Sequence, residues 1–92
     1  MYEDLRRVVG PKRTLEILQL LSREGTLNYS DVELKVETSS DVISTSLNTL
    51  VAYGLVERTE ESKRNVRYDM TDRGNDFLDK IDKMDKFLDR PH

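Results

Sequence analysis

Apolar residues recur every three or four positions in two stretches of the chain, which predicts two amphipathic helices. The first is expected to begin after Gly10-Pro11, since proline is tolerated in a first helical turn, and to end at Gly25. The second is expected after the polar break Thr38-Ser39-Ser40. The predicted buried positions are Leu15, Ile17, Leu18 and Leu21 in the first helix, and Val42, Ile43, Leu47, Leu50 and Val51 in the second.

A shorter helix is predicted between these two. Asn28-Tyr29-Ser30 offers N-cap residues for a helix from Asp31 to about Glu37, with Val32 and residues 34–36 as its apolar contribution. Two short helices separated by a tight polar turn, the second one amphipathic, form a helix-turn-helix, whose second helix normally enters the DNA major groove.

The alternation of apolar and polar residues changes period after Gly54. Leu55 and Val56 open an extended run that ends near Thr59, and a second run from Val66 to Met70 alternates with a period of two. The polar segment 60–65 between them is rich in turn-forming residues and is expected to project into solvent. This predicts a β-hairpin, the wing, over about residues 55–70.

A last helix is predicted over residues 71–90, with Thr71 as its N-cap and Asp72 in its first turn. Four of its apolar residues are spaced 4, 3 and 4 apart, the heptad spacing of a coiled-coil seam: Phe77, Ile81, Met84 and Leu88. Leu78 and Phe87 widen this seam. A helix of about 20 residues spans roughly 30 Å, which is longer than a small body can cover, so a homodimer is favoured over a helix folded back on its own core. The expected interface is Leu5, Phe77, Leu78, Ile81, Met84, Phe87 and Leu88, with Tyr2, Val8 and Val9 as further N-terminal candidates.

The order helix, helix, helix, hairpin, helix predicts the fold class: mainly α with a small β-hairpin wing, a winged helix-turn-helix. We expect one domain over residues 1–92, with a core of residues 1–70 and a C-terminal dimerisation helix. The chain has 92 residues, of which 36% are apolar, and no tryptophan. Only a modest core can form, and a partner subunit would add to it.

Composition excludes several classes of chemistry. With no cysteine there is no disulfide or thiolate nucleophile, and no apolar run approaches the roughly 20 residues of a membrane span, so a cytoplasmic protein is expected. The single histidine, His92, stands alone, and no catalytic triad, metal cluster or phosphate-binding loop can be assembled. We therefore expect no enzyme activity, no metal and no cofactor.

Charge is distributed unevenly around a net value of −3. Between residues 25 and 54, Lys35 is the only basic residue, against four acidic ones. The basic residues that could neutralise phosphates stand in two other places: Lys12 and Arg13 at the start of the first helix, and Lys63, Arg64 and Arg67 in the wing.

Two motifs carry a family resemblance: L-x-x-L-x-x-x-G-L-V-E-R from Leu47 to Arg58, and Y-x-M-T-x-x-G from Tyr68 to Gly74. Over about residues 8–80 the chain resembles the HxlR, PadR, ArsR and MarR superfamily of small prokaryotic transcription regulators, with HxlR most similar. The resemblance implies that the third helix contacts base edges, that the wing contacts the backbone or minor groove, and that terminal helices join two subunits. The residues expected to contact double-stranded DNA are Ser39, Ser40, Asp41, Ser44, Thr45 and Asn48 in the third helix, Lys63, Arg64, Asn65 and Arg67 in the wing, and Lys12, Arg13 and Thr14 at the first helix.

Two functions remain open at this stage. One is a sequence-specific DNA-binding transcription regulator acting as a homodimer, whose binding is weak or salt-sensitive because its third helix has no lysine or arginine. The other is a winged-helix module that binds a protein through the acidic second and third helices. No feature names an effector, an operator sequence or the direction of regulation.

Overall fold

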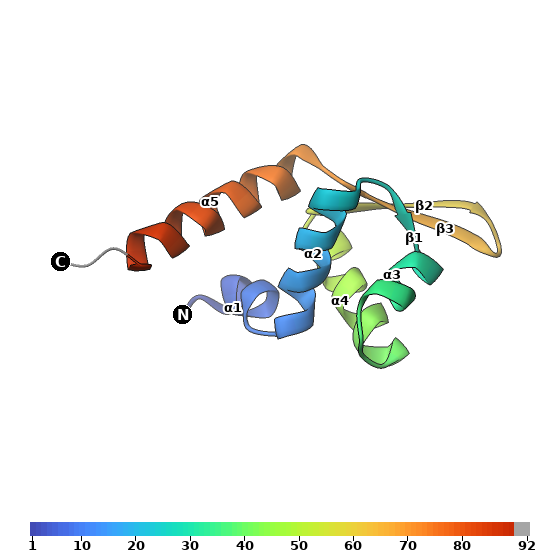
Figure 1. Cartoon of the computed structure of the whole chain (residues 1–92), viewed down its shortest axis with the longest axis horizontal. Coiled ribbons are helices and arrows are strands. Elements are labelled where there is room, and N and C mark those ends of the chain that lie inside the picture. Colours follow the sequence, from blue (N-terminus) through green and yellow to red (C-terminus); the bar gives the residue numbers. More distant parts are fainter. Residues whose placement is uncertain (90–92) are drawn as a thin grey trace.

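The structure, a computed structural model, describes residues 1–89, which form five helices and three strands (Figure 1). The elements are α1 (Glu3–Val9), α2 (Lys12–Glu24), β1 (Leu27–Asn28), α3 (Tyr29–Lys35), α4 (Ser40–Ala52), β2 (Val56–Ser62), β3 (Asn65–Met70) and α5 (Asp72–Asp89). The sequence pattern predicted four of the helices and the hairpin; α1 and β1 were not anticipated. None of the described helices combines the length and apolar character needed to cross a membrane.

Helices α2, α3 and α4 and an antiparallel sheet of order β1-β3-β2 enclose the core. Leu27 of β1 pairs with Tyr68, which lies between β1 and β2 in the sheet. The largest fully buried side chains come from all three helices and from the hairpin: Ile17, Leu18, Leu21, Val32, Ile43, Leu47, Leu50 and Val56. This arrangement confirms the winged helix-turn-helix.

Two predicted core positions are wrong. Leu34 is 84% exposed, because α3 has only two turns and its core-facing side is already occupied by Val32, with Val36 buried just beyond the helix. Val42 is 38% exposed, since one residue along a helix rotates the side chain by about 100° and Ile43 takes the inward direction.

Local hydrogen bonds explain where the helices begin and end. Asn28 and Asp31 form a capping box at α3, so this helix starts two residues earlier than predicted. After α4, Gly54 adopts a left-handed conformation (φ 73°), with Gly54 N–H donating to Val51 O and Leu55 N–H to Leu50 O, both at 3.0 Å. This is a Schellman motif, in which glycine avoids the steric cost of positive φ.

The hairpin is longer than predicted. Strand β2 continues to Ser62, a bulge follows Glu60, and only Lys63 and Arg64 remain at the turn. At its other end β3 leads into α5, where Thr71 Oγ1 accepts the N–H of Gly74 at 2.9 Å and donates to Gly54 O at 2.7 Å. The predicted N-cap is therefore confirmed, and it also ties α5 to the end of α4.

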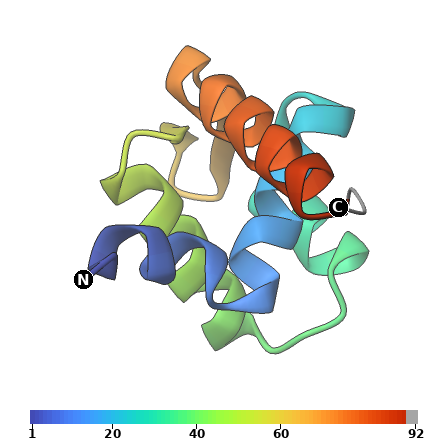
Figure 2. The same ribbon diagram turned by 90° about the vertical axis from the view of Figure 1, so that its left-hand side faces the viewer.

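Helix α5 leaves the body and gives the molecule its elongated shape, 52 × 25 × 25 Å (Figure 1). Its first half is packed on the body, where Gly74 and Leu78 are buried. Viewed from its C-terminal end, α5 crosses in front of α2, with α1 and α4 to one side (Figure 2). The second half projects beyond the core.

Replacement of Gly74 by alanine is expected to destabilise the protein by about 1–3 kcal/mol. A Cβ at this position would lie 2.1 Å from the Leu55 carbonyl oxygen, a backbone atom, so α5 must shift to admit it. This cost outweighs the roughly 1 kcal/mol that alanine gains over glycine in a helix. Urea unfolding measures it, and the exposed neighbour Asn75→Ala is the control, expected to be neutral. A G74A protein as stable as wild type would contradict the close packing described here.

Candidate nucleic-acid interface

Helix α4 presents a polar face to solvent. Ser40, Asp41, Thr45 and Asn48 are exposed, and Ser44 is half-buried. Ser39 is the N-cap, and its Oγ accepts the N–H of Val42 at 3.3 Å. The six third-helix residues predicted from the sequence thus lie at the start of α4 or on its outer side.

Tyr29 at the start of α3 holds part of this face in place. Its hydroxyl donates to the carbonyl oxygen of Ser40 at 3.1 Å and lies 2.8 Å from Ser44 Oγ. Because a phenol has one O–H, which goes to Ser40, Ser44 is the donor in the second bond. Ser40 Oγ in turn donates to Glu33 at 2.9 Å. These bonds fix how α3 crosses α4.

The two basic residues at the start of α2 differ in whether their charge is paired within the protein. Lys12 is exposed, whereas Arg13 Nη1 pairs with Glu16 at 2.7 Å. The prediction for Thr14 is wrong: it is 2% exposed, and its hydroxyl donates to Ser46 Oγ of α4 at 3.2 Å. Thr14 is two residues after Lys12, about 200° around α2, so it joins α2 to α4 instead of facing solvent.

In the wing, Lys63 and Arg64 stand exposed at the turn. Arg67 is engaged by two carboxylates, with Nη1 2.6 Å from Glu61 and Nε 3.2 Å from Asp69. Glu61 also accepts from Asn65 Nδ2 at 2.9 Å. The cationic charge available to a phosphate is therefore concentrated at the tip, and that of Arg67 is offset.

The predicted interface residues differ in how far they are exposed. Met84, Phe87 and Leu88 are 51%, 73% and 78% exposed. Leu78 is 8% exposed and belongs to the protein's own core, so its assignment to a subunit interface is wrong. The remaining predicted members, Leu5, Phe77 and Ile81, are half-buried.

The opposite side of α5 is charged. Lys83 Nζ contacts Asp79 at 2.9 Å, four residues earlier. The hydrogen bond and the charge attraction lower the pKa of the Asp79 carboxyl and raise the pKa of the Lys83 ammonium. Both groups are fully solvated, so this pair marks the water-facing side of the helix and adds little stability.

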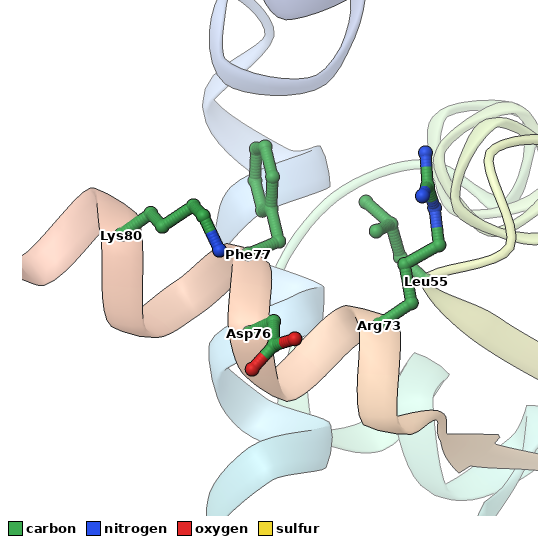
Figure 3. A pocket seen from close by; sticks show the side chains of 5 residues that line it. All are labelled: Leu55, Arg73, Asp76, Phe77 and Lys80. Atoms are coloured by element: carbon green, nitrogen blue, oxygen red, sulfur yellow. The ribbon is translucent and has the colours of Figure 1, made fainter.

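An open hollow of about 270 Å³ lies at the base of α5, lined by Leu55, Arg73, Asp76, Phe77 and Lys80 (Figure 3). Arg73 Nε donates to Tyr53 O at 2.9 Å, which fixes α5 against the end of α4. No group of three metal-binding side chains occurs within residues 1–89. The hollow offers no nucleophile paired with a base. His92, the one histidine, lies outside the described residues.

Comparison with known proteins matches residues 8–91 to the HxlR-like helix-turn-helix family. The chain belongs to this family. Family and fold are those of transcription regulators and not of enzymes, which confirms the expectation that the chain has no enzyme activity. The family match also confirms the resemblance to the HxlR, PadR, ArsR and MarR superfamily, with HxlR most similar.

The HxlR-like chain is also similar to individual proteins. An uncharacterized protein of Methanocaldococcus jannaschii is 30% identical over 57 residues, which are 62% of this chain and 48% of the relative, so the chain spans about half the relative's length. Among solved structures, one described as a MarR-family transcriptional regulator of Porphyromonas gingivalis W83 superimposes with TM-score 0.73 at 21% identity, covering 94% of this chain and 87% of that one. A transcriptional regulator homologue of Pyrococcus horikoshii OT3 has TM-score 0.68 at 18% identity, covering 96% and 99%. These likenesses show the fold.

In this HxlR-like domain, sequence reasoning missed Tyr29, which connects α3 to α4. The available signal was an aromatic residue with a hydroxyl directly after the N-cap Asn28. In the structure this hydroxyl contacts Ser40, which is eleven residues away in sequence. The sequence also did not identify Arg67 as the partner of Glu61, the pair that offsets part of the wing charge.

Proposed function

We propose that the protein is a sequence-specific DNA-binding transcription regulator that acts as a homodimer. Helix α4 enters the major groove, and the wing contacts the backbone or minor groove. The protein regulates by occupying a promoter, most simply as a repressor, in the cytoplasm of a prokaryotic cell. The proposed unit comprises the winged-helix core of residues 1–70 and a dimerisation helix over residues 71–90.

The observation that carries the proposal is the exposed polar face of α4 in a winged-helix frame whose wing turn carries exposed cations. Asp41, Thr45 and Asn48 are open to solvent, and Lys63 and Arg64, the cations of this frame, are exposed at the wing turn. The wing turn and helices α3 and α4 lie toward the end of the molecule opposite the C-terminal end of α5 (Figure 1). One end of the protein can therefore contact a duplex while its other end stays free for a second subunit.

The second subunit is proposed from the apolar surface of α5. Met84, Phe87 and Leu88 continue the seam begun by Phe77 and Ile81, and a seam of this length exposed to water favours pairing with an identical helix. A two-fold dimer presents its two recognition helices to half-sites about 34 Å apart, one turn of DNA.

The expected binding is strongly salt-dependent. Lys12, Lys63 and Arg64 give three phosphate contacts per subunit, or about six per dimer, so affinity should fall about 10³-fold between 50 and 200 mM salt. The test is a titration of purified protein against its own upstream DNA and a random duplex at both salt concentrations. Tighter binding to the upstream fragment supports the proposal.

One observation favours a different function. Leu34 is 84% exposed on α3 between the acidic residues Glu33 and Glu37, a surface suited to a basic protein partner with an apolar contact. If the protein binds neither duplex at low salt, the DNA-binding proposal fails and this protein-interaction function is favoured.

A further inference from the structure

The hydrogen bonds of α4 separate its polar residues into engaged and free side chains. The hydroxyl protons of Ser40 and Ser44 are donated within the protein, to Glu33 and Tyr29 respectively, and Thr49 Oγ1 donates to Thr45 O. A hydroxyl has one proton to donate, so these serines have none left for a base. Asp41, Thr45 and Asn48 make no side-chain hydrogen bond within the part of the chain that the structure describes, and all three are exposed.

The three free residues lie in one row. Their spacing of four and then three residues places them on the same side of α4, opposite the buried Ile43, Leu47 and Leu50. We define Asp41, Thr45 and Asn48 as the base-contact row. Seven residues of helix separate its ends, about 10 Å, or about three base-pair steps along a duplex.

From these side chains we infer a base preference for the operator half-site, an inference that rests on the proposed DNA-binding function. Asp41 accepts the N4 amino hydrogen of a cytosine, Asn48 pairs with N6 and N7 of an adenine about three steps away, and the Thr45 methyl contacts a thymine methyl between them. Tyr29 is a positioning residue, because its hydroxyl joins α3 to Ser40 and Ser44 of α4.

Asp41 also acts against unspecific binding. Its carboxylate is exposed in the first turn of α4, so it repels phosphates unless a cytosine amino group faces it. This explains how a recognition helix without lysine or arginine can be selective. Affinity for DNA comes from Lys63 and Arg64 at the wing, and discrimination between base sequences comes from the base-contact row.

Reciprocal substitutions test the inference. Asp41→Asn is expected to change the cytosine preference to adenine at the first position, since an amide pairs with adenine, and Asn48→Asp is expected to change adenine to cytosine at the second. Each preference should be about tenfold. Asp41→Asn should also bind a random duplex more tightly than wild type, because it removes a negative charge. Thr45→Ser keeps the hydroxyl and should lose only the thymine preference.

The measurement is selection of bound duplexes from a randomised library by purified wild type and each variant. Asn75→Ala is the control, because Asn75 is exposed on α5 outside the base-contact row, and this variant should select the same sequences as wild type. Urea unfolding of each variant establishes that the fold is intact, as expected for exposed positions. Wild type and variants that all select one common sequence would overturn the base assignments and leave the DNA-binding function standing. A wild-type protein that retains no duplex would overturn both.

Discussion

Replacing Met84 and Leu88 with aspartate is expected to convert the proposed dimer to a monomer and to lower its affinity for a duplex with two half-sites by about 100-fold or more. Both side chains lie on the exposed seam of α5, at 51% and 78% exposure, so the monomer loses little packing of its own. A charge on each seam position must be desolvated to pair the helices, which opposes association. Sedimentation equilibrium gives the oligomeric state, and a duplex titration gives the affinity.

Lys86→Asp is the matched control for this prediction. Lys86 lies on α5 between the two seam residues in sequence but on the opposite side of the helix, where it is exposed. Introducing the same aspartate there should leave the dimer intact. A double variant that stays dimeric, or a wild-type protein that is monomeric, would show that α5 does not join the subunits.

Neutralising the wing turn with Lys63→Ala and Arg64→Ala is expected to weaken DNA binding on the order of 100-fold at low salt. A dimer loses four phosphate contacts, so the plot of log affinity against log salt should become less steep by about 3 to 4. Sequence preference should remain, because the wing cations are expected to face the backbone and α4 the bases. Titrations of one selected duplex at several salt concentrations measure both quantities.

Arg67→Ala separates this effect from a general loss of positive charge. The Arg67 guanidinium already pairs with Glu61 and Asp69, so its removal should weaken binding far less than that of the two turn residues. Equal losses for the two variants would indicate that total charge, and not the exposed wing turn, governs binding.

Periodicity predicted the helices α2, α4 and α5 and the hairpin because each signal spans several turns or several strand residues. Periodicity did not predict the short elements. Helix α1 has seven residues and buries only Val8, and β1 has two residues and exists because Leu27 pairs with Tyr68 forty-one positions later. Such pairing depends on the tertiary structure, so no local pattern could predict it.

The sequence indicated which elements carry the candidate DNA-contacting residues, but not how each side chain is packed. Thr14 was assigned to the DNA surface from its place at a helix start, yet the packing of α2 on α4 turns it toward Ser46. Leu78 lies beside the heptad seam, where the sequence suits contact with a partner or with the protein's own core equally well, and in the structure it is buried in the core. The sequence could not distinguish engaged serines from free ones, because the Tyr29 bonds join residues eleven and fifteen positions apart.

The most direct test of a dimeric, sequence-specific DNA-binding protein is a hydroxyl-radical footprint on the genomic fragment that purified protein binds most tightly. Two equal protected segments, with centres about one helical turn (about 10 base pairs) apart, are the predicted result. A single protected segment, or uniform weak protection along the fragment, would contradict it.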